Sequence, residues 1–149
     1  MRSTLVLGIG NILLRDEGVG VRAVEILQRM DLPEGVQVID GGTSGADLIE
    51  HLADRSKVVV IDAVEGEGLP GTIYRLRRDD LMCSSRGSIS LHQIGLVESL
   101  TMARFLGCDP QEVIVFGVQP GSISPGLELT PEVVSAVPKI VEAVLEEIS

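Results

Sequence analysis

Short apolar runs alternate with segments of helical spacing along the chain, and this alternation restricts the fold more than any other feature. Strand-like runs are expected at residues 4–10, 36–39, 57–61, 72–77 and 112–118. Helical segments are expected at residues 17–30, around 48–52, after 90 and from 130 onward. We therefore predict a single α/β domain over residues 1–149, a three-layer sandwich with an open, mostly parallel twisted sheet of about five strands and helices on both faces.

Two of these segments carry finer expectations. Residues 72–77 alternate polar and apolar side chains, which indicates an edge strand with one face in water. Thr130 followed by Pro131 is a favourable start for the last helix, and Pro138 inside that helix is expected to kink or split it. Between strand and helix, residues 79–90 are polar and irregular, and we expect a mobile loop there.

Capping residues also predict where two other helices begin. Asp16 is expected to be the N-cap of the first helix. Ser90 and Gln93 form a capping-box pattern ahead of an apolar stripe, which would place His92 in the first turn of a helix.

The balance of charges favours some partners over others. The chain has 22 acidic and 12 basic residues and a net charge of −10, which disfavours nucleic acid and anionic membranes as partners. Cations or basic peptides fit better, although an acidic surface also simply confers solubility. Cys83 and Cys108 are too few for a disulfide framework, and no apolar run approaches the ~18 residues of a spanning helix. We expect a cytoplasmic protein.

Polar residues that follow different apolar runs predict one site. Glu17, Asp62 and His92 are each expected near the carboxyl edge of the sheet, where open α/β sheets bind ligands. Two carboxylates and an imidazole suit a hard-to-borderline metal ion. Each also has a local explanation: Asp62 could cap a turn, Glu17 could favour the helix dipole, and His92 could be a solvated first-turn residue. Asp40, before two glycines, could cap a turn or line the same rim.

A dinucleotide site is an alternative for the first glycines. Gly8 and Gly10 begin the pattern G-x-G-x-x-G, but Leu13 occupies the third glycine position. Asp16 and Glu17 would stand where the pyrophosphate should bind, and their negative charge works against it.

Four ordered motifs resemble one known family over essentially the whole chain. The motifs are the segments 8–20 (GIGNILLRDEGVG), 40–43 (DGGT), 60–63 (VIDA) and 90–93 (SLHQ). They resemble those of the hydrogenase maturation endopeptidases, which trim the C-terminus of the large subunit of nickel-iron hydrogenases. The resemblance implies that Glu17, Asp62 and His92 contact nickel, and that Asp40 matches a position implicated in substrate recognition or turnover.

The resemblance further implies a peptidase whose partner is the nickel-loaded precursor of a large subunit. The nickel would be carried by that substrate, and cleavage would remove a short C-terminal extension. Residues 79–90 and 119–129 would hold specificity for one hydrogenase.

The motifs leave the chemistry open. One hypothesis is that the metal polarises the scissile carbonyl or activates a bound water. The other is that Asp16 or Asp40 acts as a general base, in the manner of an aspartic-type endopeptidase. A nickel-sensing maturation chaperone that does not cleave, a dinucleotide-binding protein and a metalloenzyme for small molecules are the remaining alternatives.

Overall fold

A computed structural model describes residues 3–43, 48–82, 90–91 and 96–149. Its elements are, in chain order, β1 (Thr4–Ile9), the 3-10 turn η1 (Arg15–Gly18), α1 (Val19–Leu27), β2 (Val36–Gly42), α2 (Leu48–Leu52), β3 (Lys57–Glu65), β4 (Ile73–Arg77), α3 (Arg78–Met82), β5 (Ser90–Leu91), α4 (Leu96–Phe105), β6 (Glu112–Val118) and α5 (Pro131–Ile148). Within these residues no helix has both the length and the apolar character needed to cross a membrane.

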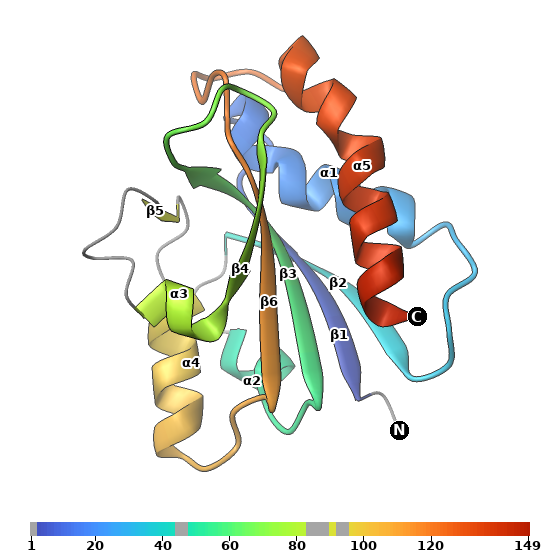
Figure 1. Cartoon of the computed structure of the whole chain (residues 1–149), viewed down its shortest axis with the longest axis vertical. Helices are drawn as coiled ribbons and strands as arrows, with labels where there is room; N and C mark the ends of the chain where they lie inside the picture. Colours follow the sequence, from blue (N-terminus) through green and yellow to red (C-terminus); the bar gives the residue numbers. More distant parts are fainter. Residues whose placement is uncertain (1–2, 44–47, 83–89, 92–95) are drawn as a thin grey trace.

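One sheet with the strand order β2-β1-β3-β6-β4 forms the centre of the molecule (Figure 1). The strands β2, β1, β3 and β6 are parallel, β4 is an antiparallel edge strand, and the two-residue β5 pairs with the end of β3. The predicted α/β fold with a mostly parallel sheet is therefore confirmed. The chain leaves β1 toward β2 on one side and returns to β3 on the other, so a topological switch point lies between β1 and β3.

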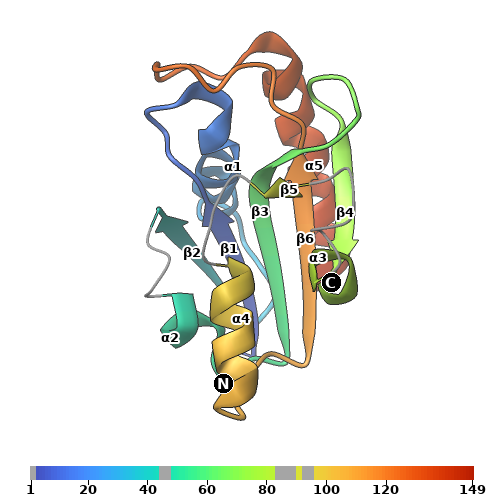
Figure 2. The same ribbon diagram turned by 90° about the vertical axis from the view of Figure 1, so that its left-hand side faces the viewer.

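Helices cover both faces of the sheet, as predicted. α1 and α5 lie on one face, and α2 and α4 lie on the other (Figures 1 and 2). Successive residues of a strand face opposite sides. In β1, for example, Val6 packs into the α1/α5 core while Leu5 and Leu7 pack into the α2/α4 core.

Two long elements differ from the prediction. β3 continues to Glu65, so Asp62 lies inside the strand and not at its end, because β6 goes on pairing with it. α5 is one helix of 18 residues, so of the two effects expected of Pro138, a kink or a split, the split does not occur. Pro138 lies on the exposed side of α5, and the opposite side is buried along the helix from Val133 to Val144. This continuous apolar contact outweighs the one backbone hydrogen bond that the proline removes.

Three local predictions were wrong. Gly18 is the N-cap of α1, because the turn η1 carries the chain past Asp16 before the helix begins. Ser90 belongs to the strand β5 and pairs with Glu65, so it does not cap the helix α4, which begins at Leu96. Residues 79–82 of the expected loop are helical and belong to α3, whereas residues 83–89 of that loop lie outside the described residues. The apolar stripe of α4 is as expected, since Leu96, Leu100 and Ala103 are buried.

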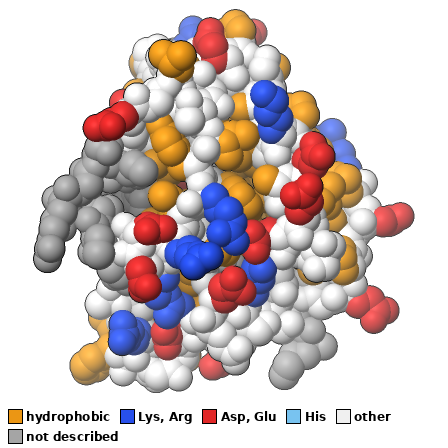
Figure 3. All heavy atoms as spheres, viewed as in Figure 1, with side chains coloured by type: hydrophobic (Ala, Val, Ile, Leu, Met, Phe, Trp, Pro, Cys, Tyr) orange, Lys and Arg blue, Asp and Glu red, His pale blue; other side chains and the backbone are white. Residues whose placement is uncertain are grey.

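Acidic and basic side chains are mixed on the face that carries the edge strand (Figure 3). Glu147 at the end of α5 pairs with Lys57 at 2.6 Å and with Arg75 of β4 at 2.9 Å. Arg78 pairs with Asp109 at 2.8 Å. The net negative charge of the chain is therefore not concentrated on this face.

Candidate active site

Asp62 lies at the switch point of the sheet. The pairing of β1 with β3 ends where Gly8 lies beside Ile61, and Asp62, the next residue of β3, pairs with Gly117 of β6 and with no residue of β1. The side chain of Asp62 is completely buried, and its Oδ1 accepts a hydrogen bond of 2.8 Å from the backbone N–H of Ala63. A buried carboxylate is thus held at the place where open α/β sheets bind ligands.

The turn that carries Glu17 lies against the same strand. The chain leaves β1 through Gly10, whose φ of +145° is not open to residues with a side chain. A Cβ at Gly10 would lie 1.9 Å from the carbonyl oxygen of Glu17, so only glycine lets η1 fold back onto the end of β1. η1 contacts β3, and Glu17 is half-buried there. The structure therefore brings Glu17 and Asp62 to one edge of the sheet.

His92 lies outside the described residues. β5 ends at Leu91, which pairs with Val64, two residues beyond Asp62. Among the described residues no group of three His, Cys, Asp or Glu side chains could hold a metal ion. The three-residue metal site with His92 therefore stays a prediction.

Asp40 lies on a β-bulge at the end of β2. Gly8 pairs with Asp40 and Ile9 pairs with Gly42, so Gly41 is an extra residue in β2. The Oδ1 of Asp40 accepts a hydrogen bond of 2.8 Å from the N–H of Gly42, and the side chain is exposed. Asp40 lines a cleft of about 350 Å³ together with apolar residues of the turn after β1, among them Leu13.

Asp16 has an environment that the sequence did not indicate. It is completely buried, and its carboxylate accepts four hydrogen bonds from residues of the 119–130 loop. The donors are the backbone N–H groups of Gly121, Ser122 and Thr130 and the hydroxyl of Thr130. Sequence reasoning identified Thr130 only as a helix start, although its hydroxyl makes no capping bond to α5.

Gln119 is a further buried polar residue near this edge, and the sequence did not indicate it. Its Oε1 accepts hydrogen bonds from the hydroxyl of Tyr74 at 2.7 Å and from the N–H of Gly66 at 2.8 Å. These contacts attach the loop after β3 to the end of β6.

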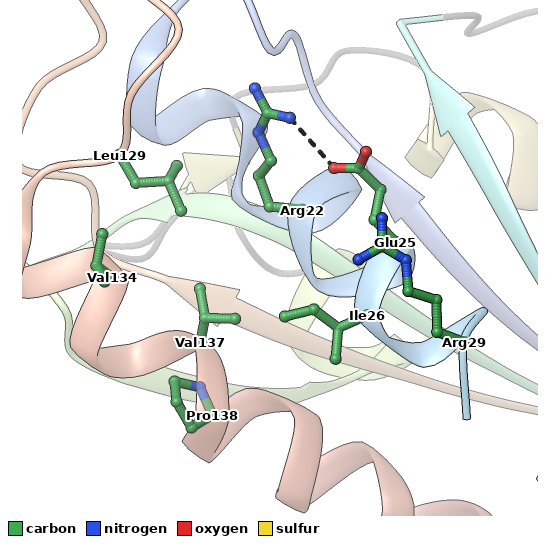
Figure 4. Close-up of a pocket in the computed structure, with 8 residues that line it drawn as sticks. All are labelled: Arg22, Glu25, Ile26, Arg29, Leu129, Val134, Val137 and Pro138. Atoms are coloured by element: carbon green, nitrogen blue, oxygen red, sulfur yellow. Dashed lines mark hydrogen bonds and ion pairs between the residues drawn. The ribbon is translucent and has the colours of Figure 1, made fainter. Parts of the chain in front are cut away.

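A larger pocket of about 540 Å³ lies between α1 and α5, away from these residues (Figure 4). Ile26 and Val137 point toward each other across it, and Arg22 forms an ion pair with Glu25 at its edge. Of the predicted site residues that the structure describes, Asp16, Glu17, Asp40 and Asp62, none lines this pocket. The carboxyl edge of the sheet, with Glu17, Asp62 and Asp40, is therefore the candidate active site.

Comparisons with known proteins agree with this fold and show the family. A family model described as hydrogenase maturation protease matches residues 21–147. The chain is 43% identical over 143 residues to the hydrogenase 2 maturation protease of Escherichia coli (strain K12), covering 95% of this chain and 87% of that protein. It is also 43% identical over 123 residues to the hydrogenase expression/formation protein HupM of Azotobacter chroococcum mcd 1, of which it spans only 58%.

Solved structures of such proteins superpose closely. The hydrogenase maturating endopeptidase HybD from E. coli matches with a TM-score of 0.89 at 42% identity, over 99% of this chain and 91% of that one. The NiFe hydrogenase maturation protease HybD from Thermococcus kodakarensis matches with a TM-score of 0.84 at 26% identity over 100% of both chains. From the family model and these relatives, the chain belongs to the hydrogenase maturation proteases, a family of peptidases.

Proposed function

We propose that the protein is an endopeptidase that removes a short C-terminal extension from the nickel-loaded precursor of a nickel-iron hydrogenase large subunit. The observation that carries this proposal is the position of Asp62, buried at the switch point beside the turn that carries Glu17. Family membership supports the peptidase reaction, and the E. coli relative is named for the maturation of hydrogenase 2.

The proposal treats nickel as part of the substrate. Glu17, Asp62 and His92 would contact the ion while the precursor's own ligands still hold it. Two carboxylates and one imidazole are ligands suited to a borderline divalent ion. A protein that supplies only part of the coordination sphere binds the ion well only when the precursor supplies the rest. Nickel contact would then report that the precursor is loaded.

Hydrolysis also needs a proton acceptor near the scissile bond, and we assign this role to Asp40. A water oxygen attacks the scissile carbonyl carbon while its proton passes to Asp40. When the C–N bond breaks, that proton goes to the leaving amine nitrogen. Asp40 suits this role because it is exposed beside a cleft, whereas the oxygens of Asp16 already accept four hydrogen bonds inside the protein. Chemistry of this kind would make the enzyme an aspartic-type endopeptidase.

The remaining features of the proposal follow the sequence. We propose that the protein works in the cytoplasm with the precursor as its partner. Nucleic acid and anionic membranes are not proposed as partners, since the net charge of the chain is −10. The chaperone and dinucleotide alternatives have weaker support, because the relatives belong to a peptidase family.

The test uses purified precursor with and without nickel, and mass spectrometry of the products. Loss of a C-terminal peptide from the nickel-loaded precursor alone supports both cleavage and nickel recognition. Binding without cleavage of either form would overturn the peptidase. Cleavage of both forms would overturn the nickel recognition.

Variants of the three proposed nickel contacts sharpen this test. Glu17→Gln, Asp62→Asn and His92→Ala should each lose cleavage and affinity for the nickel-loaded precursor together. His51→Ala is the matched control for His92→Ala, because His51 lies in α2 on the opposite side of the sheet from α1. This control variant should cleave the precursor normally. A variant that keeps full affinity for the nickel-loaded precursor and cleaves normally would remove its residue from the proposed set.

A further inference from the structure

We propose that Asp16 is a positioning residue, which joins the turn η1 to the 119–130 loop and thereby shapes the surface that binds the precursor. This inference rests on the proposed function. It assigns to Asp16 a role different from that of the general base that the sequence suggested.

The carboxylate of Asp16 is the common partner of three points on the loop. Oδ2 accepts hydrogen bonds from the N–H of Gly121 at 2.7 Å, from the N–H of Ser122 at 3.0 Å and from the hydroxyl of Thr130 at 2.7 Å. Oδ1 accepts one from the N–H of Thr130 at 2.8 Å. A general base must reach the substrate, but this carboxylate is completely buried and faces the loop.

Backbone hydrogen bonds continue the junction on both sides of Asp16. The N–H of Asp16 donates to the carbonyl of Ser122 at 3.1 Å, and the N–H of Arg15 donates to that of Gly126 at 3.0 Å. In return, the N–H of Gly126 donates to the carbonyl of Leu13 at 2.8 Å. In Figures 1 and 2 the loop after β6 lies beside the turn before α1 at the carboxyl edge. The two segments therefore form one unit.

Gly121 packs closely against Asp16 and its neighbours. A Cβ at Gly121 would lie 3.0 Å from the hydroxyl oxygen of Thr130, 3.3 Å from Cβ of Pro70 and 3.4 Å from Oδ2 of Asp16. Since glycine has no Cβ, the loop at residue 121 can approach the Asp16 carboxylate and accept this close packing while its N–H donates to Asp16.

The joined segments present apolar side chains to solvent. Leu13 is 60% exposed, Ile123 41% and Leu127 61%. Leu13 also lines the cleft that contains Asp40. A polypeptide bound with its scissile bond at Asp40 would extend over these side chains, and they would remain in one arrangement only while Asp16 holds the loop. Loss of the Asp16 contacts should therefore weaken precursor binding more than it slows the chemical step.

Asp16→Asn and Thr130→Val separate these roles. Asparagine places an NH₂ group against several donors, and valine removes the hydroxyl donor while keeping the backbone N–H of residue 130. We expect KM for the precursor to rise about tenfold or more in Asp16→Asn and by a smaller factor in Thr130→Val. The single-turnover rate at saturating precursor should stay within about threefold of wild type. Matched controls are Asp31→Asn and Thr101→Val, both exposed and outside these segments, and they should behave as wild type.

Hydrogen exchange gives a readout that does not depend on cleavage. Exchange of the amides of Gly121 and Ser122 should accelerate in both variants, and should not change in the controls. The inference is overturned if Asp16→Asn lowers the saturating rate about 10²–10⁴-fold while Thr130→Val is normal, which is the signature of a general base. The inference is equally overturned if Thr130→Val alters neither KM nor amide exchange. This variant tests the inference even if Asp16→Asn fails to fold. Failure of the wild-type protein to cleave would instead overturn the proposed function.

Discussion

Gly20 of α1 lies so close to Ile61 of β3 that a Cβ on Gly20 would stand 2.1 Å from the carbonyl oxygen of Ile61. The same Cβ would lie 2.6 Å from the carbonyl oxygen of Ile9 at the end of β1. The first turn of α1 therefore rests directly on the backbone of both strands that form the switch point. Asp62 follows Ile61, so this close packing also fixes the strand beside the candidate site.

Gly20→Ala should destabilise the protein, although alanine is the better helix former. Alanine in a helix usually gains about 1 kcal/mol over glycine. Here its Cβ would overlap backbone atoms that cannot move independently of the sheet. We expect a net loss of about 1–3 kcal/mol in the free energy of unfolding, measured by urea denaturation.

The control for this substitution is Gly107→Ala. Gly107 has a φ of +76°, but beyond its two chain neighbours no atom of the described residues lies within 4 Å of an added Cβ, so the backbone conformation is the cost there. Its expected loss is about 1 kcal/mol. If Gly20→Ala were as stable as wild type, α1 would be able to move away from the sheet, and the packing argument would be wrong.

Pro138→Ala should stabilise the protein. Pro138 is exposed in the middle of α5, where it removes the hydrogen bond to the carbonyl of Val134. Alanine restores that bond and keeps the buried side of α5 unchanged. We expect the free energy of unfolding to rise by about 1–3 kcal/mol, with a higher Tm in calorimetry. Val134→Ala, also exposed on α5, is the control for loss of apolar surface. A lower Tm for Pro138→Ala would mean that the proline fits the helix without cost.

The main elements of the fold were predictable because their signals are local. The buried runs of β1, β3 and β6 and the apolar stripes of α4 and α5 depend on residues a few positions apart. The sequence-based predictions were wrong where contacts between distant residues determine the secondary structure. α5 passes through Pro138 because its buried side is continuous, and the two residues of β5 are too short to show any periodicity.

The candidate site was predictable only in part. The carboxyl edge and the acids on it follow from the order of strands and helices. The hydrogen bonds of Asp16 could not be predicted from that order, because its partners lie 105 to 114 residues further along the chain. A single acid after a glycine turn resembles a helix cap in sequence, and only the folded 119–130 loop reveals the four donors.

Glu147 should make stability depend on pH in the acidic range. Burial by itself would raise the pKa of Glu147, but hydrogen bonds and charges from Lys57 and Arg75 outweigh it and leave the pKa below the ordinary value of 4.5. The folded state therefore binds this proton less readily than the unfolded state. The stabilisation is complete above pH 4.5 and is lost as the pH falls through the folded-state pKa.

Glu147→Gln tests this dependence. At pH 7 the substitution should lower the free energy of unfolding by about 1–2 kcal/mol, because a neutral amide pairs weakly with Lys57 and Arg75. The difference from wild type should shrink as the pH falls below 4.5. Denaturation curves across this range measure it, with the exposed Glu142→Gln on the same helix as the control. A difference that stays constant with pH would contradict the role of the Glu147 charge.

Asp40→Asn should keep precursor binding but lose the rate of cleavage. Asparagine retains a side-chain oxygen that can accept the 2.8 Å hydrogen bond from the N–H of Gly42, so the β-bulge at the end of β2 is preserved. The amide cannot accept a proton from the attacking water, and removal of a general base typically costs about 10²–10⁴-fold in rate. Single-turnover cleavage and the Kd for nickel-loaded precursor should be measured together, with Asp31→Asn as the matched exposed control. Cleavage at the wild-type rate would exclude Asp40 as the base. A large rise in Kd at unchanged saturating rate would assign Asp40 to recognition of the substrate, because the cleft that it lines would then contribute binding and not proton transfer.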